Sequence, residues 1–324
     1  TLNSSKEIEA DLVILAIGIK PNGELAKNSG LTVNQRGGIV VDQYLKTSDD
    51  NIYAVGDAIE VNDLVNQVTA MVPLAGPANK QGRIAADNLT GRNVAYKGTQ
   101  GTSVAKVFDM IVSTTGTNEK TLKALGKKYG EDYLTAHIHP NNHAGYYPEA
   151  TKISLKMVFS PTDGRVMGAQ AVGFDGVEKR IDVLATAIRF GGTVHDLTEL
   201  ELAYAPPFGS AKDPVNMLGY VAENMLNGTV ENIHWNQLSS YKGKEYVVLD
   251  VRDSDEVVTG LYPGATHIPL GSLRDRAGEL DKEIPVMVYC AVGLRGYIAT
   301  RILRQLGFKE VKNLSGGIVT DDFA

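Results

Sequence analysis

Cys290 is the only thiol in the 324-residue sequence, and it lies in the run Val-Met-Val-Tyr-Cys-Ala-Val-Gly-Leu-Arg-Gly. The apolar residues of Ile284–Tyr289 predict a buried parallel strand, and the apolar spacing of Gly293–Leu306 predicts a helix. A thiol between them faces loop N–H groups and the positive end of the helix, which favour a thiolate. Arg295, five residues on, can complete a ring of donors around whatever the sulfur carries. The pattern indicates a reactive cysteine, with a small buried apolar residue as the alternative.

Three further motifs surround this loop in the C-terminal region. Tyr246–Val251 predicts a second buried strand, followed by an Arg-Asp pair and the acidic start of a short helix at Ser254–Val258. Pro263–Leu270 predicts a turn that leads into a strand, and Leu314–Gly317 reads Leu-Ser-Gly-Gly. Strands that alternate with helices predict a small parallel α/β domain. In this order, Asp-Val-Arg, Gly-Ala-x-x-Ile-Pro, Tyr-Cys-x-x-Gly-x-Arg and Leu-x-Gly-Gly resemble a rhodanese (sulfurtransferase) domain over residues 232–324.

This resemblance implies a role for each residue of the loop. Cys290 is the expected nucleophile, which holds sulfane sulfur as a persulfide. The expected cradle around that sulfur consists of Ala291, Val292, Gly293, Leu294 and Arg295. A tyrosine-phosphatase-like loop is the competing interpretation, but it places five residues between cysteine and arginine, whereas four stand here. The residue before the thiol is Tyr289 rather than a histidine, and the smaller ring suits a sulfur atom.

The composition, with 43% hydrophobic and 22% charged residues, is that of an ordinary globular protein. At about 150 residues per domain, the length of 324 residues predicts two domains. The net charge of −6 argues against nucleic acid as a partner and gives no support for an anionic membrane surface. No apolar run approaches the roughly 18 residues of a membrane span. One cysteine cannot form an internal disulfide and fits a reducing compartment, so we expect a cytoplasmic protein.

The N-terminal region contains a Gly-Asp pair at the end of a predicted strand. The elements expected before it are a doubly buried strand, a short helix and part of an antiparallel hairpin, at Ala10–Ile19, Glu24–Ser29 and Gly38–Tyr44. Ile52–Val55 then predicts a short strand that ends at Gly56 and Asp57. Glycine permits close backbone approach and a carboxylate accepts hydroxyl hydrogen bonds, so the pair suits a bound polyol. Alone, such a pair is more often a turn or a helix N-cap.

The longer run around this pair is more specific. Thr47–Asp57 resembles the second flavin-binding motif of the pyridine nucleotide–disulfide oxidoreductases, and residues 16–22 resemble that family's link from its nicotinamide domain to its flavin domain. The resemblance implies that Gly56 and Asp57 bind FAD at its ribityl chain or pyrophosphate. A predicted helix follows the small-residue segment that begins Pro73, Leu74, Ala75. Its N-terminal N–H groups and dipole can stabilise negative charge on a reduced flavin, and an ordinary amphipathic helix is the alternative.

Residues 101–226 predict a further α+β layer. The expected strands are Ser103–Val112, Asp132–Ile138, Lys152–Phe159 and Val166–Val172, and the expected helices are Glu119–Tyr129, 176–190 and 214–227. Asp213 and Pro214 supply the cap and the first position of the last helix. The segment resembles the dimerisation domain of the same flavoenzymes.

Two prolines and a run of small residues make Leu202–Asn216 a rigid loop. Tyr204 offers a phenol and Lys212 a cation, which are useful beside a thiol or a phosphorylated thiol substrate. The loop resembles the coenzyme A–disulfide reductase branch, in which such a tyrosine reaches the active site of the partner subunit. The resemblance therefore implies a homodimer with two-fold symmetry, and a tyrosine packed in an interface is the alternative.

Three nearby histidines, His137, His139 and His143, are candidate metal ligands. No cysteine lies near them, and alternate placement on an exposed strand is commoner than ligation. We therefore expect no metal site.

Together, the resemblances predict a multidomain α/β and α+β protein with a partial FAD/NAD(P)-binding region at 1–100, a dimerisation domain at 101–226 and a rhodanese-like parallel α/β domain at 232–324. They imply an FAD-dependent NAD(P)H disulfide or persulfide reductase of the coenzyme A–disulfide reductase type. The sequence begins at Thr1, and the family's Gly-rich FAD and NAD turns and its N-terminal redox cysteine are absent. We therefore expect a C-terminal portion of a longer chain, which does not turn over alone. An FAD-dependent NADH oxidase or peroxidase, and a sulfurtransferase alone, are the alternatives.

Overall fold

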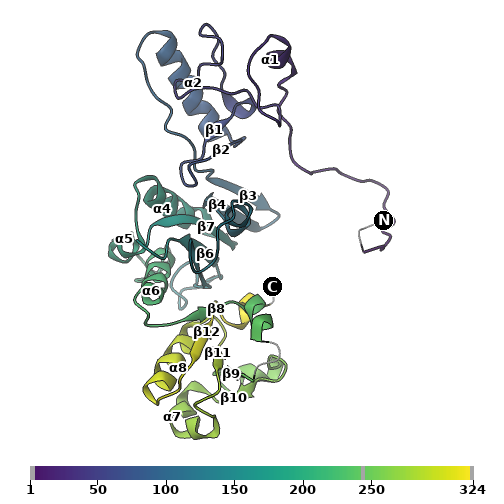
Figure 1. The fold of residues 1–324 in the computed structure, drawn as a ribbon. Helices are drawn as coiled ribbons and strands as arrows, with labels where there is room; N and C mark the ends of the chain where they lie inside the picture. Colours follow the sequence, from purple (N-terminus) through teal and green to yellow (C-terminus); the bar gives the residue numbers. More distant parts are fainter. Residues whose placement is uncertain (1–3, 242–244, 322–324) are drawn as a thin grey trace. The chain divides into compact units, whose positions relative to one another are not determined.

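A computed structural model describes residues 4–241 and 245–321 of the chain. The elements are labelled in Figure 1 and fall into two compact units, residues 1–99 and residues 100–324. Each unit has a hydrophobic core of its own. No helix within the described ranges is long and apolar enough to cross a membrane.

The first unit has little regular structure. Its elements are α1 (Glu24–Asn28), the 3₁₀ turn η1 (Gly56–Ala58), the antiparallel pair β1 (Val61–Asn62) and β2 (Thr69–Ala70), and α2 (Ala75–Leu89). Leu45, Ile59 and Ala85 are buried in its core. Ala85 lies on α2 and Ile59 directly follows η1, so α2 packs against η1. The predicted helices at Glu24 and Ala75 are confirmed.

The doubly buried strand predicted over Ala10–Ile19 is wrong. These residues form no strand, and Leu12 and Ile17 are 77% and 90% exposed. A strand buried on both faces needs paired strands beside it and packed layers above and below, and no described residue supplies them. The strands predicted for Gly38–Tyr44 and Ile52–Val55 are not formed. These residues take part only in isolated bridges, which join Ile39 to Val33 and to Ile59, and Tyr53 to Lys46.

The second unit begins with a five-stranded antiparallel sheet. Its strands, in spatial order, are β3 (Ser103–Val107), β4 (Met110–Gly116), β7 (Val166–Gly173), β6 (Ser154–Phe159) and β5 (Leu134–Ile138). The accompanying helices are α3 (Glu119–Ala124), α4 (Val177–Arg189), α5 (Val194–Glu199) and α6 (Pro214–Leu226). Helix α4 packs on β4 and β7, and α6 packs on α5 and β5. The predicted α+β layer is confirmed, and the single strand expected at 103–112 is a hairpin of two strands.

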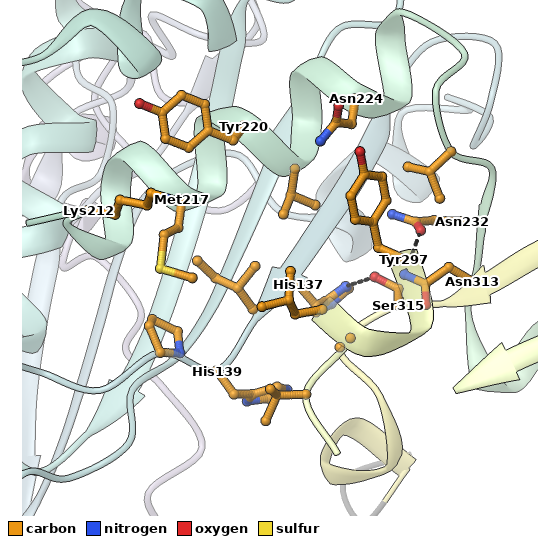
Figure 2. Close-up of a pocket in the computed structure, with 18 of the residues that line it drawn as sticks. His137, His139, Lys212, Met217, Tyr220, Asn224, Asn232, Tyr297, Asn313 and Ser315 are labelled. Atoms are coloured by element: carbon orange, nitrogen blue, oxygen red, sulfur yellow. Dashed lines mark hydrogen bonds between the residues drawn. The ribbon is translucent and has the colours of Figure 1, made fainter. Parts of the chain in front are cut away.

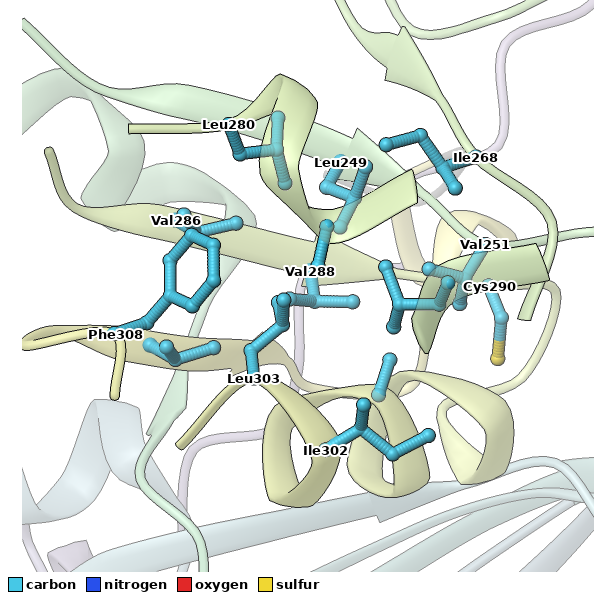
Figure 3. Packing of buried hydrophobic residues seen from close by; sticks show 14 residues of the cluster. Leu249, Val251, Ile268, Leu280, Val286, Val288, Cys290, Ile302, Leu303 and Phe308 are labelled. Atoms are coloured by element: carbon cyan, nitrogen blue, oxygen red, sulfur yellow. The ribbon is translucent and has the colours of Figure 1, made fainter. Parts of the chain in front are cut away.

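A five-stranded parallel sheet completes the second unit. Its strands, in spatial order, are β10 (Thr266–His267), β9 (Val247–Asp250), β11 (Val286–Tyr289), β12 (Val311–Leu314) and β8 (Asn232–Ile233). The helical elements are η2 (Trp235–Tyr241), η3 (Glu256–Thr259), η4 (Leu270–Ser272), α7 (Leu273–Arg276), η5 (Ala277–Glu279), α8 (Leu294–Gln305) and α9 (Ile318–Asp321). Val286, Val288 and Leu303 belong to the cluster between this sheet and α8 (Figure 3). The predicted parallel α/β domain is therefore confirmed.

Candidate functional site

Cys290 lies where the chain leaves the central strand β11. The residue is 1% exposed and belongs to the same apolar cluster as Val251 and Ile268. Its sulfur points toward the start of α8 (Figure 3) and accepts the N–H of Gly293 at 3.2 Å. Gly293 is the N-cap of α8 and has a φ of 106°, which an L side chain rarely adopts. The thiol therefore faces a backbone donor and the positive end of a helix, and both can stabilise negative charge that develops on the sulfur.

Arg295 pairs with two carboxylates of the segment that follows β9. Its Nη1 donates to Asp253 Oδ2 at 2.8 Å, and its Nη2 donates to Glu256 Oε1 at 2.7 Å. This pairing lowers the pKa of Glu256 to about 2. Carboxylates are stronger acceptors for a guanidinium than a thiol is. The place of Arg295 in a donor ring around the sulfur stays a prediction. Arg295 ties the start of α8 to the segment that follows β9.

A cavity of about 430 Å³ borders the Cys290 loop (Figure 2). The loop contributes Val292, Gly293 and Leu294, and the segment before α6 contributes Lys212. Apolar side chains such as Ile138, Met217 and Val221 line it together with polar ones such as Tyr220, Asn224 and Tyr297. The structure thus brings Lys212 to the same cavity as three of the five residues expected to form the cradle. Ala291 and Arg295, the other two, do not line this cavity.

Tyr204 is separate from this cavity. Its side chain is 48% exposed, and its hydroxyl lies 3.4 Å from that of Tyr146. This contact raises the pKa of Tyr146. The phenol is thus presented to solvent on the second unit, in a position where another molecule can reach it.

A buried ion pair fixes the loop between Tyr204 and Lys212. Asp213 is 3% exposed, and its Oδ2 accepts from Arg180 Nη2 at 2.9 Å. Its Oδ1 caps α6 by accepting the N–H of Val215 at 3.0 Å. Arg180 also donates to the carbonyl of Asn142 at 2.8 Å. Because Lys212 directly precedes this fixed aspartate, its backbone is held at the edge of the cavity.

The residues expected to bind flavin gather in the first unit. Gly56 has a φ of 85°, with open space where a side chain would project, and its N–H donates to Gln81 Oε1 on α2 at 2.7 Å. The neighbouring Asp57 is exposed. Leu74 is extended and caps α2 without a side-chain hydrogen bond, so the N–H groups of the first turn, which begins at Ala75, lack that partner. A carboxylate and a helix N-terminus beside η1 fit the hydroxyl and phosphate groups of a dinucleotide, and Pro73 lies just before this turn.

Successive parts of the chain match known families. Residues 1–82 match the pyridine nucleotide-disulphide oxidoreductase family, residues 102–214 match its dimerisation domain, and residues 235–320 match the rhodanese-like domain. The chain belongs to the pyridine nucleotide-disulphide oxidoreductases and carries a rhodanese-like domain. Membership in this oxidoreductase family implies the use of a flavin and NAD(P)H.

Individual relatives of the chain agree with the family match. Over 224 residues the chain is 37% identical to a coenzyme A disulfide reductase of Staphylococcus epidermidis, covering 69% of this chain and 50% of the relative. The crystal structure of reduced Bacillus anthracis CoADR-RHD superposes with a TM-score of 0.92 at 48% identity, covering 98% of this chain and 56% of that one. The structure of an NAD-dependent persulfide reductase from A. fulgidus superposes with a TM-score of 0.86 at 42% identity. The match covers 95% of this chain and 55% of that one. The chain spans about half the length of the curated relatives it matches.

The expectation that His137, His139 and His143 lie on an exposed strand is wrong. His139 and His143 are 7% and 6% exposed, and His137 is half-buried. His137 and His139 instead contact the rhodanese-like domain through Ser315 and Thr320. Within residues 4–241 and 245–321 no cluster of three or more His, Cys, Asp or Glu side chains is arranged to hold a metal ion.

Several residues at the site carry no signal in the sequence. Tyr146, the partner of Tyr204, stands 58 positions away from it. Asp253 and Glu256, which hold Arg295, look like ordinary acidic residues of a helix start. The one available signal was the period-two spacing of His137 and His139, which places both on one face of a strand.

Proposed function

We propose that this chain is part of an FAD-dependent NAD(P)H disulfide or persulfide reductase of the coenzyme A type, in which Cys290 carries sulfane sulfur. The proposed division is 1–100 for the partial FAD/NAD(P) region, 101–226 for the dimerisation domain and 232–324 for the rhodanese-like domain. The observation that carries the proposal is the hydrogen bond from the Gly293 N–H to Cys290 Sγ at the start of α8. This donor can stabilise negative charge on the sulfur, and the match of residues 235–320 to the rhodanese-like domain supports a sulfur-carrying role for the loop.

Sulfur transfer through Cys290 follows from thiolate chemistry. The thiolate attacks the outer sulfur of a donor such as thiosulfate, a new S–S bond forms on Cys290, and sulfite leaves with the electron pair of the broken bond. An acceptor such as cyanide then attacks the terminal sulfur, and the Cys290 thiolate leaves. The Gly293 N–H and the helix dipole stabilise negative charge on this group in both steps. Arg295 acts indirectly by holding the start of α8 against Asp253 and Glu256.

The first unit supplies the proposed flavin contacts. Asp57 would accept hydrogen bonds from the ribityl hydroxyls, and Gly56 leaves open space for close approach. The first-turn N–H groups of α2, which Pro73, Leu74 and Ala75 introduce, would face the phosphate or the ring. Bound FAD supplies two-electron transfer from NAD(P)H to a disulfide. In balance, NAD(P)H, one proton and a disulfide give NAD(P)⁺ and two thiols, or one thiol and hydrogen sulfide from a persulfide.

The substrate class that we propose is a low-molecular-weight thiol of the coenzyme A type. Lys212 would pair with a phosphate of such a molecule. The cavity that Lys212 lines extends to Val292, Gly293 and Leu294, so an extended thiol would have a lined space beside the sulfur-carrying loop. Relatives named coenzyme A disulfide reductase and persulfide reductase support this class.

A homodimer is the proposed assembly. Residues 102–214 match a dimerisation domain, and apolar side chains on the β3–β4 hairpin are exposed. Val107, Met110 and Val112 share one face of this hairpin and are 54%, 42% and 39% exposed. An exposed apolar face of this kind is typical of a subunit interface. The solvent-facing Tyr204 would then reach the active site of the partner subunit.

Comparison of three oxidants tests the reductase activity. The full-length protein, loaded with FAD, should oxidise NAD(P)H faster with coenzyme A disulfide or coenzyme A persulfide than with hydrogen peroxide. Lys212→Ala should raise the KM for either coenzyme A substrate, with little change for a small disulfide that has no phosphate. Faster turnover with peroxide would instead assign the scaffold to a peroxidase or oxidase.

A further inference from the structure

Alternate residues of the edge strand β5 reach the rhodanese-like domain. Thr135 and His137 lie on one face of this strand, and His139 continues the same period of two just beyond its end. Each meets one polar partner: Thr135 Oγ1 lies 2.9 Å from His234 Nε2, His137 Nδ1 lies 3.3 Å from Ser315 Oγ (Figure 2), and His139 Nε2 lies 2.8 Å from Thr320 Oγ1. His137 and His139 thus link the antiparallel sheet to the segment 315–320, and Thr135 links it to His234.

The segment 315–320 is also the support of the Cys290 loop. The N–H of Ile318 donates to the carbonyl of Cys290 at 2.9 Å, and the N–H of Val319 donates to the carbonyl of Ala291 at 3.2 Å. Gly317 packs so closely that a Cβ on it would lie 2.5 Å and 2.6 Å from these two carbonyl oxygens. Because the contact is backbone against backbone, the loop follows any movement of this segment.

Of the side chains Thr135, His137 and His139, His139 is the most firmly held. It is 7% exposed, and its Nδ1 is 2.9 Å from Ser154 Oγ on β6, so both ring nitrogens are engaged. Burial lowers its pKa to about 4, and the neutral ring offers one donor and one acceptor. Gly316 leaves the space for this arrangement, because a Cβ there would lie 2.0 Å from Thr320 Oγ1 and 3.1 Å from His139 Nε2.

We propose that His139 is a positioning residue for the sulfur-carrying loop. Through Thr320 it fixes Ile318 and Val319 against the Cys290 loop, and this keeps Cys290 Sγ in place to accept the N–H of Gly293. The dimerisation domain thereby sets the geometry of the rhodanese-like thiol. The use of the loop in sulfur transfer rests on the proposed function, whereas the positioning itself does not.

Alkylation of Cys290 tests the positioning without any assumption about function, because the chain has no other cysteine. In the full chain, His139→Ala and Thr320→Val should each speed the reaction of the buried thiol with iodoacetamide by about tenfold, the effect of about one lost hydrogen bond. The double variant should be no faster than either single variant, because both changes remove the same contact. His139→Gln keeps a side-chain amide able to donate and accept, and should restore the slow rate.

Sulfur transfer from thiosulfate to cyanide provides the second readout. His139→Ala and Thr320→Val should each lower kcat by about tenfold and leave the KM for thiosulfate unchanged. Each change misplaces the loop without altering the binding of thiosulfate. His195→Ala is the control, because His195 is exposed, pairs with Glu223 on α6 and should leave both readouts unchanged.

Additive effects in the double variant, or an unchanged alkylation rate in both single variants, would overturn the inference. If His139→Ala fails to fold, Thr320→Val and His139→Gln still decide the question from the two ends of the same bond. A wild-type chain without thiosulfate activity would count against the proposed function alone, because the alkylation rates would continue to report on His139.

Discussion

The two carboxylates that hold Arg295 determine which groups stabilise the Cys290 thiolate. With the guanidinium bound to Asp253 and Glu256, the nearest donor to the sulfur is the N–H of Gly293. The hydrogen bond to the Cys290 sulfur therefore depends on the backbone conformation at Gly293, which has a φ of 106°.

Gly293→Ala tests this dependence. A Cβ at this position would meet its nearest neighbour, Gly316 N, at 3.6 Å, so the cost is backbone strain rather than a clash. We expect the free energy of unfolding to fall by about 1–2 kcal/mol. Cys290 alkylation should slow, because the hydrogen bonds from Ile318 and Val319 still hold the loop and keep the thiol buried, while the N–H that stabilises negative charge on the sulfur moves away.

Gly278→Ala is the matched control for this substitution. Gly278 lies in η5 with open space around it and without a positive φ, so alanine should leave stability unchanged or raise it slightly. Urea unfolding and iodoacetamide kinetics measure both variants. Equal behaviour of the two alanine variants would contradict the role assigned to the Gly293 backbone.

At the scale of elements, the sequence predicts what local pattern determines. The strand before Cys290, the helix after it and the capped helix α6 follow from apolar runs and from Asp213 with Pro214, and all three are confirmed. The strand at Ala10–Ile19 is wrong because burial on both faces depends on other elements. The six-residue helix α5 is too short to show a period, although Thr193 and Asp196 form a capping box there.

In the candidate site, too, the sequence predicts features that local pattern determines and misses those that depend on distant residues. The order of the loop motifs located Cys290 and Gly293, and the loop before α6 located Lys212. The direction of Arg295 could not be predicted, because its two acceptors lie about 40 positions earlier in the chain. The contacts of His137 and His139 could not be predicted either, because their partners lie nearly 180 positions later.

The contact between β5 and the rhodanese-like domain should weaken in acid. Burial, with a smaller effect of Lys152, lowers the pKa of His139 to about 4. Burial also lowers the pKa of His234 to about 4, although Glu119 opposes this shift and Lys156 and Lys123 add to it. The ordinary value is about 6.5, so the unfolded chain binds more protons between pH 4 and 6.5. Stability is therefore complete above this window and is lost as the pH falls through it.

Urea unfolding at pH 7 and pH 5 checks this prediction. The free energy of unfolding should be lower at pH 5 than at pH 7, and each histidine should account for up to about 2 kcal/mol of this decrease. The double variant His139→Gln with His234→Gln should show a smaller loss than wild type, while the exposed control His195→Gln should not. An equal loss in the double variant and in wild type would show that other groups cause the pH dependence.

At the scale of the whole molecule, one chain joins an oxidoreductase-family region, a dimerisation domain and a rhodanese-like domain. The exposed hairpin face of β3 and β4 is the surface through which we expect two copies to meet. Val112→Glu places a charge on this face and should raise the dimer dissociation constant by at least about tenfold, as loss of a buried apolar contact does. Analytical ultracentrifugation measures the change.

Leu125→Glu is the control for the interface prediction. Leu125 follows α3 and is 41% exposed, close to the 39% of Val112, so the two substitutions add the same charge at similar exposure. If both variants or neither variant dissociated, the hairpin face would not be the interface.

The most direct test of the central claim is the mass of the chain after incubation with thiosulfate. We predict that the wild-type protein gains one sulfur atom, that peptide mapping places it on Cys290, and that cyanide removes it as thiocyanate. Cys290→Ser should gain none. A wild-type chain that gains no sulfur, or a Cys290→Ser chain that gains it equally, would contradict the assignment of Cys290 as the sulfur carrier.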